Sequence, residues 1–328
     1  MSRRVPHGLG AVLVLAALSL SAIHAAAETY PSRIVRMVVP QSAGGVTDVI
    51  ARAVAQRLSE MWGQQVVVEN KPGANYQIGM AAAAKADPDG YTLLVTSEAY
   101  TINPLLYSNL TYDPVRDLTP ITGLIILNHA LVANPSLPVK GLPDLLALAK
   151  QKPGEINYAT YGAASTGHLN MEMLQSATGT KFFPVHYKGA APAFTDVLAG
   201  HVPLMFISVG TPMEAWQAGK VKILAVGSEQ RLPRLPDVPT IAEADLPGFR
   251  AVTWFGLFTT GGTPTEIVAK VNADVQAIFA DAAFREKYLT PQMFEPLTSS
   301  PEQFAEFLAA EAQKWSKVIR DAKLRIEN

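Results

Sequence analysis

Short apolar runs alternate with amphipathic segments from Ile34 onward, and this alternation constrains the fold more than any other feature of the chain. The apolar runs are short enough for buried strands, and the segments between them carry apolar residues at helical spacing. Strands and helices that alternate in sequence are typical of a parallel sheet covered by helices. Such a sheet binds its ligands at the carboxyl ends of its strands. The sequence therefore predicts an α/β protein whose functional loops follow the strands.

The first of these units has a glycine loop between its strand and its helix. The run Ile34–Val39 has the pattern of a buried strand, Gly44 and Gly45 break it, and a helix begins near Thr47 or Asp48. Main-chain N–H groups at the start of a helix can hold an anion without any arginine. The alternative is a tight turn with Thr47 or Asp48 as the N-cap. Neither glycine motif of nucleotide-binding loops is present, which argues against a nucleotide.

Residues 1–27 have the pattern of a cleavable signal peptide. Arg3 and Arg4 form a basic start, Ala11–Leu20 an apolar stretch, and Ala25–Ala27 a cleavage site of small residues. The apolar stretch is too short to span a membrane. We therefore expect export to the periplasm and a soluble mature protein.

Composition argues against several classes of function. The chain has 27 Lys and Arg against 28 Asp and Glu, and loss of the two arginines of the signal peptide leaves 25 against 28. This balance argues against nucleic acid as a partner. The sequence contains no cysteine, so disulfides and cysteine–metal sites are excluded. The remaining histidines form no metal-binding motif, so we expect no metal and no cofactor.

Two irregular joints, near 125–135 and 228–250, divide the alternating pattern. We expect 28–128 and 251–328 to form one lobe, 129–250 to form the other, and the ligand to bind in the cleft between them. In the last part, Ser300–Gln303 has the pattern of a capping box with Pro at the first helical position, which predicts the start of a final helix.

Six sequence blocks point to one protein family. They are "IVRMVVPQSAGGVTDVIARAVAQRL", "VVVENKPGANYQIGMAAAAKADPDGYTLL", "YDPVRDLTPIT", "NYATYGAASTGHLNMEML", "VHYKGAAPAFTDVLAGHV" and "LPDVPTIAEADLPGF". In this order they resemble the substrate-binding receptors of tripartite tricarboxylate transporters, the Bug family of periplasmic solute-binding proteins. The resemblance runs from about Tyr30 to the C-terminus. It implies a periplasmic-binding-protein type II fold, a small organic acid as ligand, membrane transporter subunits as partners and no catalysis; we expect a monomer.

In that family, backbone N–H groups, hydroxyls and ordered water hold the carboxylate of the ligand. The resemblance carries the ligand contacts of the first lobe onto Gln41, Ser42, Ala43, Gly44, Gly45, Thr47, Asp48, Ala74, Asn75, Tyr76, Ser97 and Glu98. It carries those of the second lobe onto Tyr161, Gly162, Ala164, Ser165, Thr166, His168, His186, Lys188, Gly189 and Ile207.

Several of these positions depart from the family pattern. Tyr76 and Tyr161 replace small residues, so their rings either fill the cleft or flank a flat ligand. Ile207 stands where many members carry an aspartate that suits an amino group, whereas Glu98 could supply such a charge from the other lobe. Our interpretation favours an aromatic or other planar carboxylate over an amino acid.

Two alternative functions belong to other classes. Gly162–Gly167, with Ser165 and the nearby His168, resembles the nucleophile loop of an exported serine hydrolase. The spacing is one residue longer than that loop requires, which argues against catalysis. A receptor that presents its ligand to a membrane kinase has the same sequence features as a transport receptor, and this alternative stays open.

Overall fold

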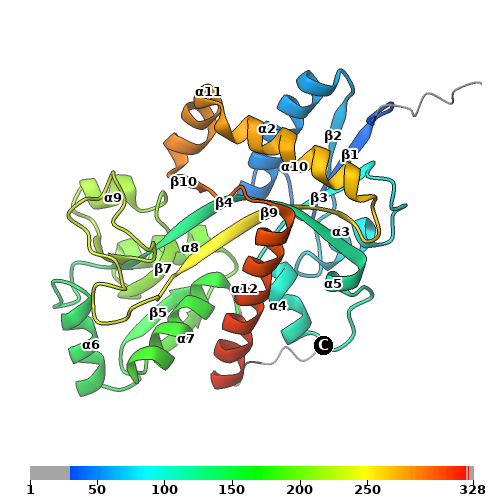
Figure 1. Cartoon of the computed structure of the whole chain (residues 1–328). Coiled ribbons are helices and arrows are strands. Elements are labelled where there is room, and N and C mark those ends of the chain that lie inside the picture. Colours follow the sequence, from blue (N-terminus) through cyan, green and yellow to red (C-terminus); the bar gives the residue numbers. More distant parts are fainter. Residues whose placement is uncertain (1–29, 164, 323, 325–328) are drawn as a thin grey trace, which may run out of the picture.

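The structure is a computed structural model that describes residues 30–163, 165–322 and 324. The predicted signal peptide and Ala164 lie outside these residues. Along the described chain, strands and helices alternate as the sequence predicts (Figure 1).

The elements fall into three stretches of the chain. The first contains β1 (Val35–Val39), α2 (Val46–Trp62), β2 (Val66–Asn70), α3 (Gln77–Ala84), β3 (Thr92–Ser97), α4 (Ala99–Leu106), α5 (Pro114–Asp117) and β4 (Leu118–Ala133). The second contains α6 (Leu142–Gln151), β5 (Asn157–Thr160), α7 (Thr166–Thr178), β6 (Phe183–His186), α8 (Ala190–Ala199), β7 (Leu204–Ser208), α9 (Met213–Gln217) and β8 (Lys222–Val226). The third contains β9 (Val252–Thr260), α10 (Thr265–Ala280), α11 (Ala282–Phe284), a π-helical turn (Arg285–Leu289), a 3-10 turn (Thr290–Gln292), β10 (Phe294–Pro296) and α12 (Pro301–Asp321).

The described strands form one hydrogen-bonded path in the order β2-β1-β3-β9-β4-β7-β5-β6, and β8 and β10 pair with β4. β1 is parallel to β2 and β3, and β5 is parallel to β6 and β7. The prediction of a parallel sheet is wrong at the centre, where β9 lies antiparallel to β3 and β4, and β4 antiparallel to β7 and β8. β4 carries the chain from one set of strands to the other and β9 brings it back (Figure 1), so the two must run in opposite directions.

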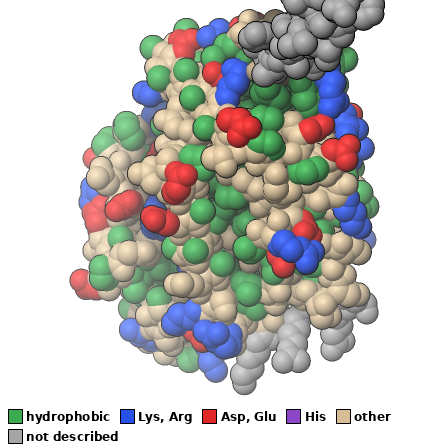
Figure 2. Space-filling model, turned by 45° about the vertical axis from the view of Figure 1, so that its right-hand side comes forward, with side chains coloured by type: hydrophobic (Ala, Val, Ile, Leu, Met, Phe, Trp, Pro, Cys, Tyr) green, Lys and Arg blue, Asp and Glu red, His purple; other side chains and the backbone are tan. Residues whose placement is uncertain are grey.

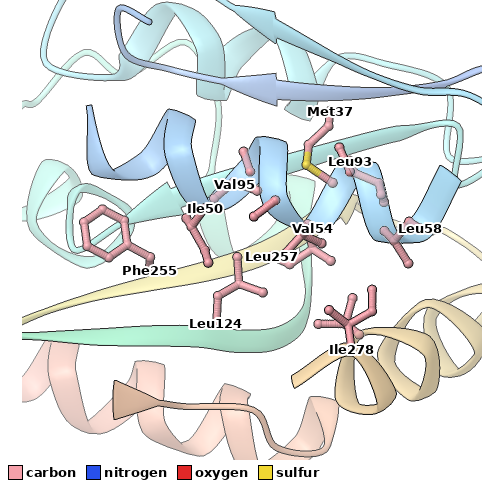
Figure 3. Packing of buried hydrophobic residues seen from close by; sticks show 14 of the residues in the cluster. Met37, Ile50, Val54, Leu58, Leu93, Val95, Leu124, Phe255, Leu257 and Ile278 are labelled. Carbon is pink, nitrogen blue, oxygen red and sulfur yellow. The ribbon is translucent and has the colours of Figure 1, made fainter. Parts of the chain in front are cut away.

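One hydrophobic core lies between α2, α10 and the strands β1, β3, β9 and β4. Figure 3 shows Ile50, Val54 and Leu58 of α2 pointing at strand residues such as Leu93 and Leu257, and all five are buried. The three helical residues recur at the spacing of one helix face. Their burial fixes α2, and therefore the glycine loop before it, against the strand ends.

A second core lies among β4, β5, β7 and β8 and the helices α6 and α7. Tyr158, Phe206 and Leu204 are fully buried within it, and Leu131 joins it from the far half of β4. Because β4 contributes to both cores, the two halves of the molecule share a continuous strand.

Helix α12 packs across the junction of the two halves. The predicted capping box is confirmed, because Ser300 and Gln303 cap each other's main chain. Farther along the helix, Trp315 packs with Leu106 of α4 and Leu169 of α7. β4, β9 and α12 all connect the halves, and no boundary between two lobes follows from the strand order alone. The predicted lobe bounds therefore stay a prediction.

An aromatic cluster anchors β9 to the first half of α12. The Trp254 ring lies 5.9 Å from the rings of Phe304 and Phe307, in edge-to-face geometry, and 6.4 Å from Phe258. Trp254 itself is fully buried. Such contacts add to the large burial of each ring, so this cluster contributes strongly to the stability of the fold.

Within the described part of the chain, no helix combines the length and apolar character that a membrane span needs. Figure 2 shows acidic and basic side chains interspersed over the face in view.

Candidate functional site

A cavity of about 270 Å³ lies where loops from both halves converge. It is lined by Gln41 after β1, Asn75 and Tyr76 after β2, Ser97 and Glu98 at the end of β3, Ala99, Ile102 and Asn103 of α4, and Tyr161, Ser165 and Thr166 after β5. β1, β2 and β3 are parallel to one another, whereas β5 runs in the opposite direction. The cavity therefore lies where the carboxyl ends of two oppositely directed sets of strands meet.

Eight of the lining residues were predicted from the sequence, and three of α4 were missed: Ala99, Ile102 and Asn103. The pair Asn103-Pro104 is of a kind that normally indicates a turn. Both residues nevertheless lie inside α4. The sequence signal at this point therefore argued against the helix that carries the missed residues.

The structure leaves the other predicted residues outside this lining, namely Ser42, Ala43, Gly44, Gly45, Thr47, Asp48, Ala74, Gly162, His168, His186, Lys188, Gly189 and Ile207. Ile207 is buried in a hydrophobic cluster of the second half. Lys188 and His186 are exposed. Their roles in ligand binding stay predictions, as does that of Ala164, which lies outside the described residues.

The glycine loop is held from within. The predicted N-caps are wrong, because α2 begins at Val46 and its N-cap is Gly45, which offers no side chain. Asp48 instead accepts the main-chain N–H of Gly44 at 2.9 Å and pairs with Arg52 at 2.9 Å. Burial opposes ionisation of Asp48, but hydrogen bonds from Arg52, Gly44 and Asn70 outweigh it and lower its pKa to about 2. The Gly44 N–H and the Asp48 charge are thus both satisfied inside the protein.

Gln41 links this loop to the cavity. Its Oε1 accepts from the Thr47 hydroxyl at 2.5 Å, and its Nε2 donates to the Tyr76 hydroxyl. Burial is the main cause that raises the pKa of Tyr76, with the Glu98 carboxylate adding to it. Tyr76 is therefore a neutral phenol whose position depends on the buried Thr47 and on Gln41.

The loop that carries Tyr76 has an unusual backbone. Ala74, Asn75 and Tyr76 have φ angles of 45°, 49° and 73°, in the left-handed region that non-glycine residues rarely adopt. Asn103 holds this loop: its Nδ2 donates to the Asn75 carbonyl at 2.8 Å, and its Oδ1 accepts from the Asn75 Nδ2 at 3.0 Å. Asn103 is fully buried. It is a positioning residue for the cavity wall.

Replacing Asn103 by Ala removes both hydrogen bonds and leaves the Asn75 carbonyl without this partner. We expect the free energy of unfolding to fall by about 1–3 kcal/mol, the usual cost of an unpaired buried polar group. Urea denaturation measures this loss. The change Asn103→Asp keeps the acceptor for the Asn75 amide but places a second oxygen, and a buried charge, against the Asn75 carbonyl, so we expect it to cost at least as much as the alanine variant. A stability equal to that of the wild type would show that the strained loop holds its shape unaided.

On the other side of the cavity, Ser165 is the N-cap of α7 and accepts the main-chain N–H of His168 at 3.4 Å. The Tyr161 ring packs against this helix so closely that a Cβ on Gly167 would lie 2.7 Å from its Cε1 atom. Burial raises the pKa of Tyr161, and the nearby Glu98 carboxylate adds to the effect. Tyr161, like Tyr76, therefore presents a neutral ring and hydroxyl to the cavity.

Glu98 connects the two sides. Its Oε1 accepts from the hydroxyl of Thr166 in α7 at 2.5 Å, and the Thr253 hydroxyl of β9 lies 3.4 Å away. Burial raises the pKa of Glu98, and the hydrogen bond from Thr166 opposes this. The same carboxylate also raises the pKa of Tyr76 and Tyr161, so all three side chains share one small space.

The sequence model of one protein family, the tripartite tricarboxylate transporter family receptor, matches residues 50–324 of this chain. The chain belongs to this receptor family. Protein BugT of Bordetella pertussis is 35% identical over 303 residues, which are 92% of this chain and 93% of BugT. R. palustris Rpa4515, solved with adipate, is 36% identical with a TM-score of 0.77, over 90% of this chain and 100% of that chain. MatC from Rhodopseudomonas palustris, solved with bound malate, is 31% identical with a TM-score of 0.72, over 88% of this chain and 100% of that chain.

These similarities confirm the predicted family and its two-lobed periplasmic-binding-protein type II fold. In this receptor the Ser165 hydroxyl accepts a main-chain N–H, and the His168 ring instead lies 3.5 Å from Glu172. Among the described residues, no cluster of three His, Asp or Glu could hold a metal ion.

Proposed function

We propose that this receptor is periplasmic, captures a small organic carboxylate between its lobes and delivers it to the membrane subunits of a tripartite tricarboxylate transporter. The lobes in this proposal are 28–128 with 251–328, and 129–250. The cavity is the observation that carries the proposal, because residues of both halves line it and none of them is Lys or Arg. The hydroxyls of Ser97, Tyr161 and Ser165 suit a carboxylate that is bound by neutral donors.

A thermal-shift screen of organic acids tests the proposal. A ligand at a hundred times its dissociation constant stabilises the folded state by about 2.7 kcal/mol. The acid is recovered unchanged from the complex in mass spectrometry if the protein is a receptor and not an enzyme. The absence of any stabilising acid would contradict the proposal. A deletion strain separates the two receptor roles, because loss of uptake indicates transport, and a changed transcriptional response with normal uptake indicates a sensor.

The two tyrosines support a planar ligand. Tyr76 and Tyr161 come from opposite halves and line the same cavity, and both are neutral. A flat ring stacked between them gains roughly 0.5–1.5 kcal/mol beyond its area of burial.

We therefore expect the double change Tyr76→Gly and Tyr161→Gly to weaken an aromatic acid more than a short aliphatic acid of equal charge. Calorimetric titration of both acids on the wild type and on the double variant measures this. The aliphatic acid is the control for any general loosening of the site. Equal losses for both acids would mean that the rings only pack, and a planar ligand would no longer be supported.

A further inference from the structure

One carboxylate oxygen in the cavity wall has no hydrogen-bond partner among the described residues. Glu98 lines the cavity, and its Oε1 is occupied by the Thr166 hydroxyl. Its Oε2 is buried, and no hydrogen-bond donor reaches it among the residues that the structure describes. A buried carboxylate oxygen without a hydrogen bond costs free energy, so a ligand that donates a hydrogen bond to it would be stabilised in the cavity.

The surrounding residues do not supply that donor. Apart from Glu98, the described residues that line the cavity are all uncharged. The positive charge of Lys314 in α12 favours the ionised form of Glu98, whereas the negative charge of Glu311 opposes it. Lys314 donates to Glu311 at 2.6 Å, so its charge is already paired within α12. The phenols of Tyr76 and Tyr161 are the other titratable groups beside Glu98.

The described residues of the protein hold only one of the two carboxylate oxygens of Glu98. The bond from Thr166 comes from the opposite half of the protein and already fixes one oxygen. The second oxygen is therefore the part of Glu98 that a ligand in the cavity can engage.

We infer that the ligand of this receptor is a carboxylate that also carries an N–H donor, such as an ammonium or a ring amine, and that Glu98 Oε2 accepts this donor. The inference rests on the proposed function and names the chemical class of its ligand. It accommodates the loss of an acid at Ile207, because the acceptor is supplied from the other side of the cavity. A planar acid with a ring amine satisfies both Glu98 and the two tyrosines.

Two matched pairs of acids test the inference: 4-aminobenzoate against benzoate, and 4-aminobutanoate against butanoate. In at least one of these pairs, we expect the wild type to bind the acid with the amino group roughly 10- to 100-fold more tightly than the acid without it. This is the range of a charge-assisted hydrogen bond. The change Glu98→Gln keeps the size of the side chain and the acceptor for Thr166 but presents an amide in place of Oε2. It is expected to abolish this preference, and because it removes a negative charge from the cavity, the acid that lacks nitrogen is expected to bind as tightly as before or more tightly.

Glu311→Gln is the matched control, since it removes the same charge close by from a residue outside the cavity lining. Calorimetry gives the affinities, and unfolding without ligand shows that each variant is folded. The inference is overturned if benzoate and butanoate bind as well as their amino partners, if Glu98→Gln keeps the preference, or if Glu311→Gln abolishes it equally. Failure of all organic acids in the wider screen would instead contradict the proposed function.

Discussion

Replacement of Trp254 by Ala is expected to lower the free energy of unfolding by about 3–5 kcal/mol, the usual cost of truncating a fully buried aromatic residue. The Trp254 ring has no exposed surface and contacts Phe304 and Phe307 edge to face. Its removal leaves a cavity at the point where β9 packs on α12. Urea denaturation, with a check that its slope is unchanged, measures the loss.

Two further variants sharpen this test. Phe183→Ala removes an aromatic ring that is 58% exposed, so it is expected to change stability by no more than about 0.5 kcal/mol. Trp254→Phe keeps most of the packing and also removes the indole N–H, which is buried and has no hydrogen-bond partner in the part of the chain that the structure describes. It is therefore expected to cost much less than the alanine variant. A loss below about 1.5 kcal/mol for Trp254→Ala would mean that the aromatic cluster rearranges to fill the space.

The second large effect is a dependence of stability on pH through Asp48. Its folded-state pKa is lowered from 3.8 to about 2 by hydrogen bonds from Arg52, Gly44 and Asn70, against the effect of burial. A lowered pKa stabilises the folded state above the unfolded-state value of 3.8, and this contribution is lost as the pH falls toward 2. The shift corresponds to about 2 kcal/mol.

The change Asp48→Asn tests this contribution. We expect the variant to be less stable than the wild type at pH 6, and the difference to shrink by about 1.5 kcal/mol as the pH is lowered to 2.5. Denaturation at a series of pH values measures both quantities. Glu243→Gln is the control, because Glu243 has a similarly lowered pKa but forms an exposed pair with Arg231. Solvent screens that pair, so its effect is expected to be much smaller. A difference between wild type and Asp48→Asn that does not vary with pH would contradict the prediction.

The resemblance to the receptor family predicted much of the site, and local patterns placed those residues in loops, because a loop after a strand can be recognised from the strand itself. Gln41, Tyr76 and Glu98 follow apolar runs, and Tyr161 and Ser165 follow another, so their place at strand ends followed from the alternation. Asn103 could not be found in this way. It acts through hydrogen bonds to a loop 28 positions earlier in the chain, and no local pattern reports a contact of that range.

The sequence by itself determined the α/β class, the order of strands and helices, the capping box of α12 and, through the six blocks, the receptor family. Each of these depends on residues close together in the chain, through hydrophobic periodicity, capping or a contiguous motif. Only the tertiary structure decided that β4 and β9 cross the centre antiparallel, that Asp48 is neutralised by Arg52 instead of capping α2, and that Glu98 meets Thr166 from the opposite half. Strand direction and contacts between distant side chains depend on how the chain returns through space, and that path is set by packing of the whole molecule.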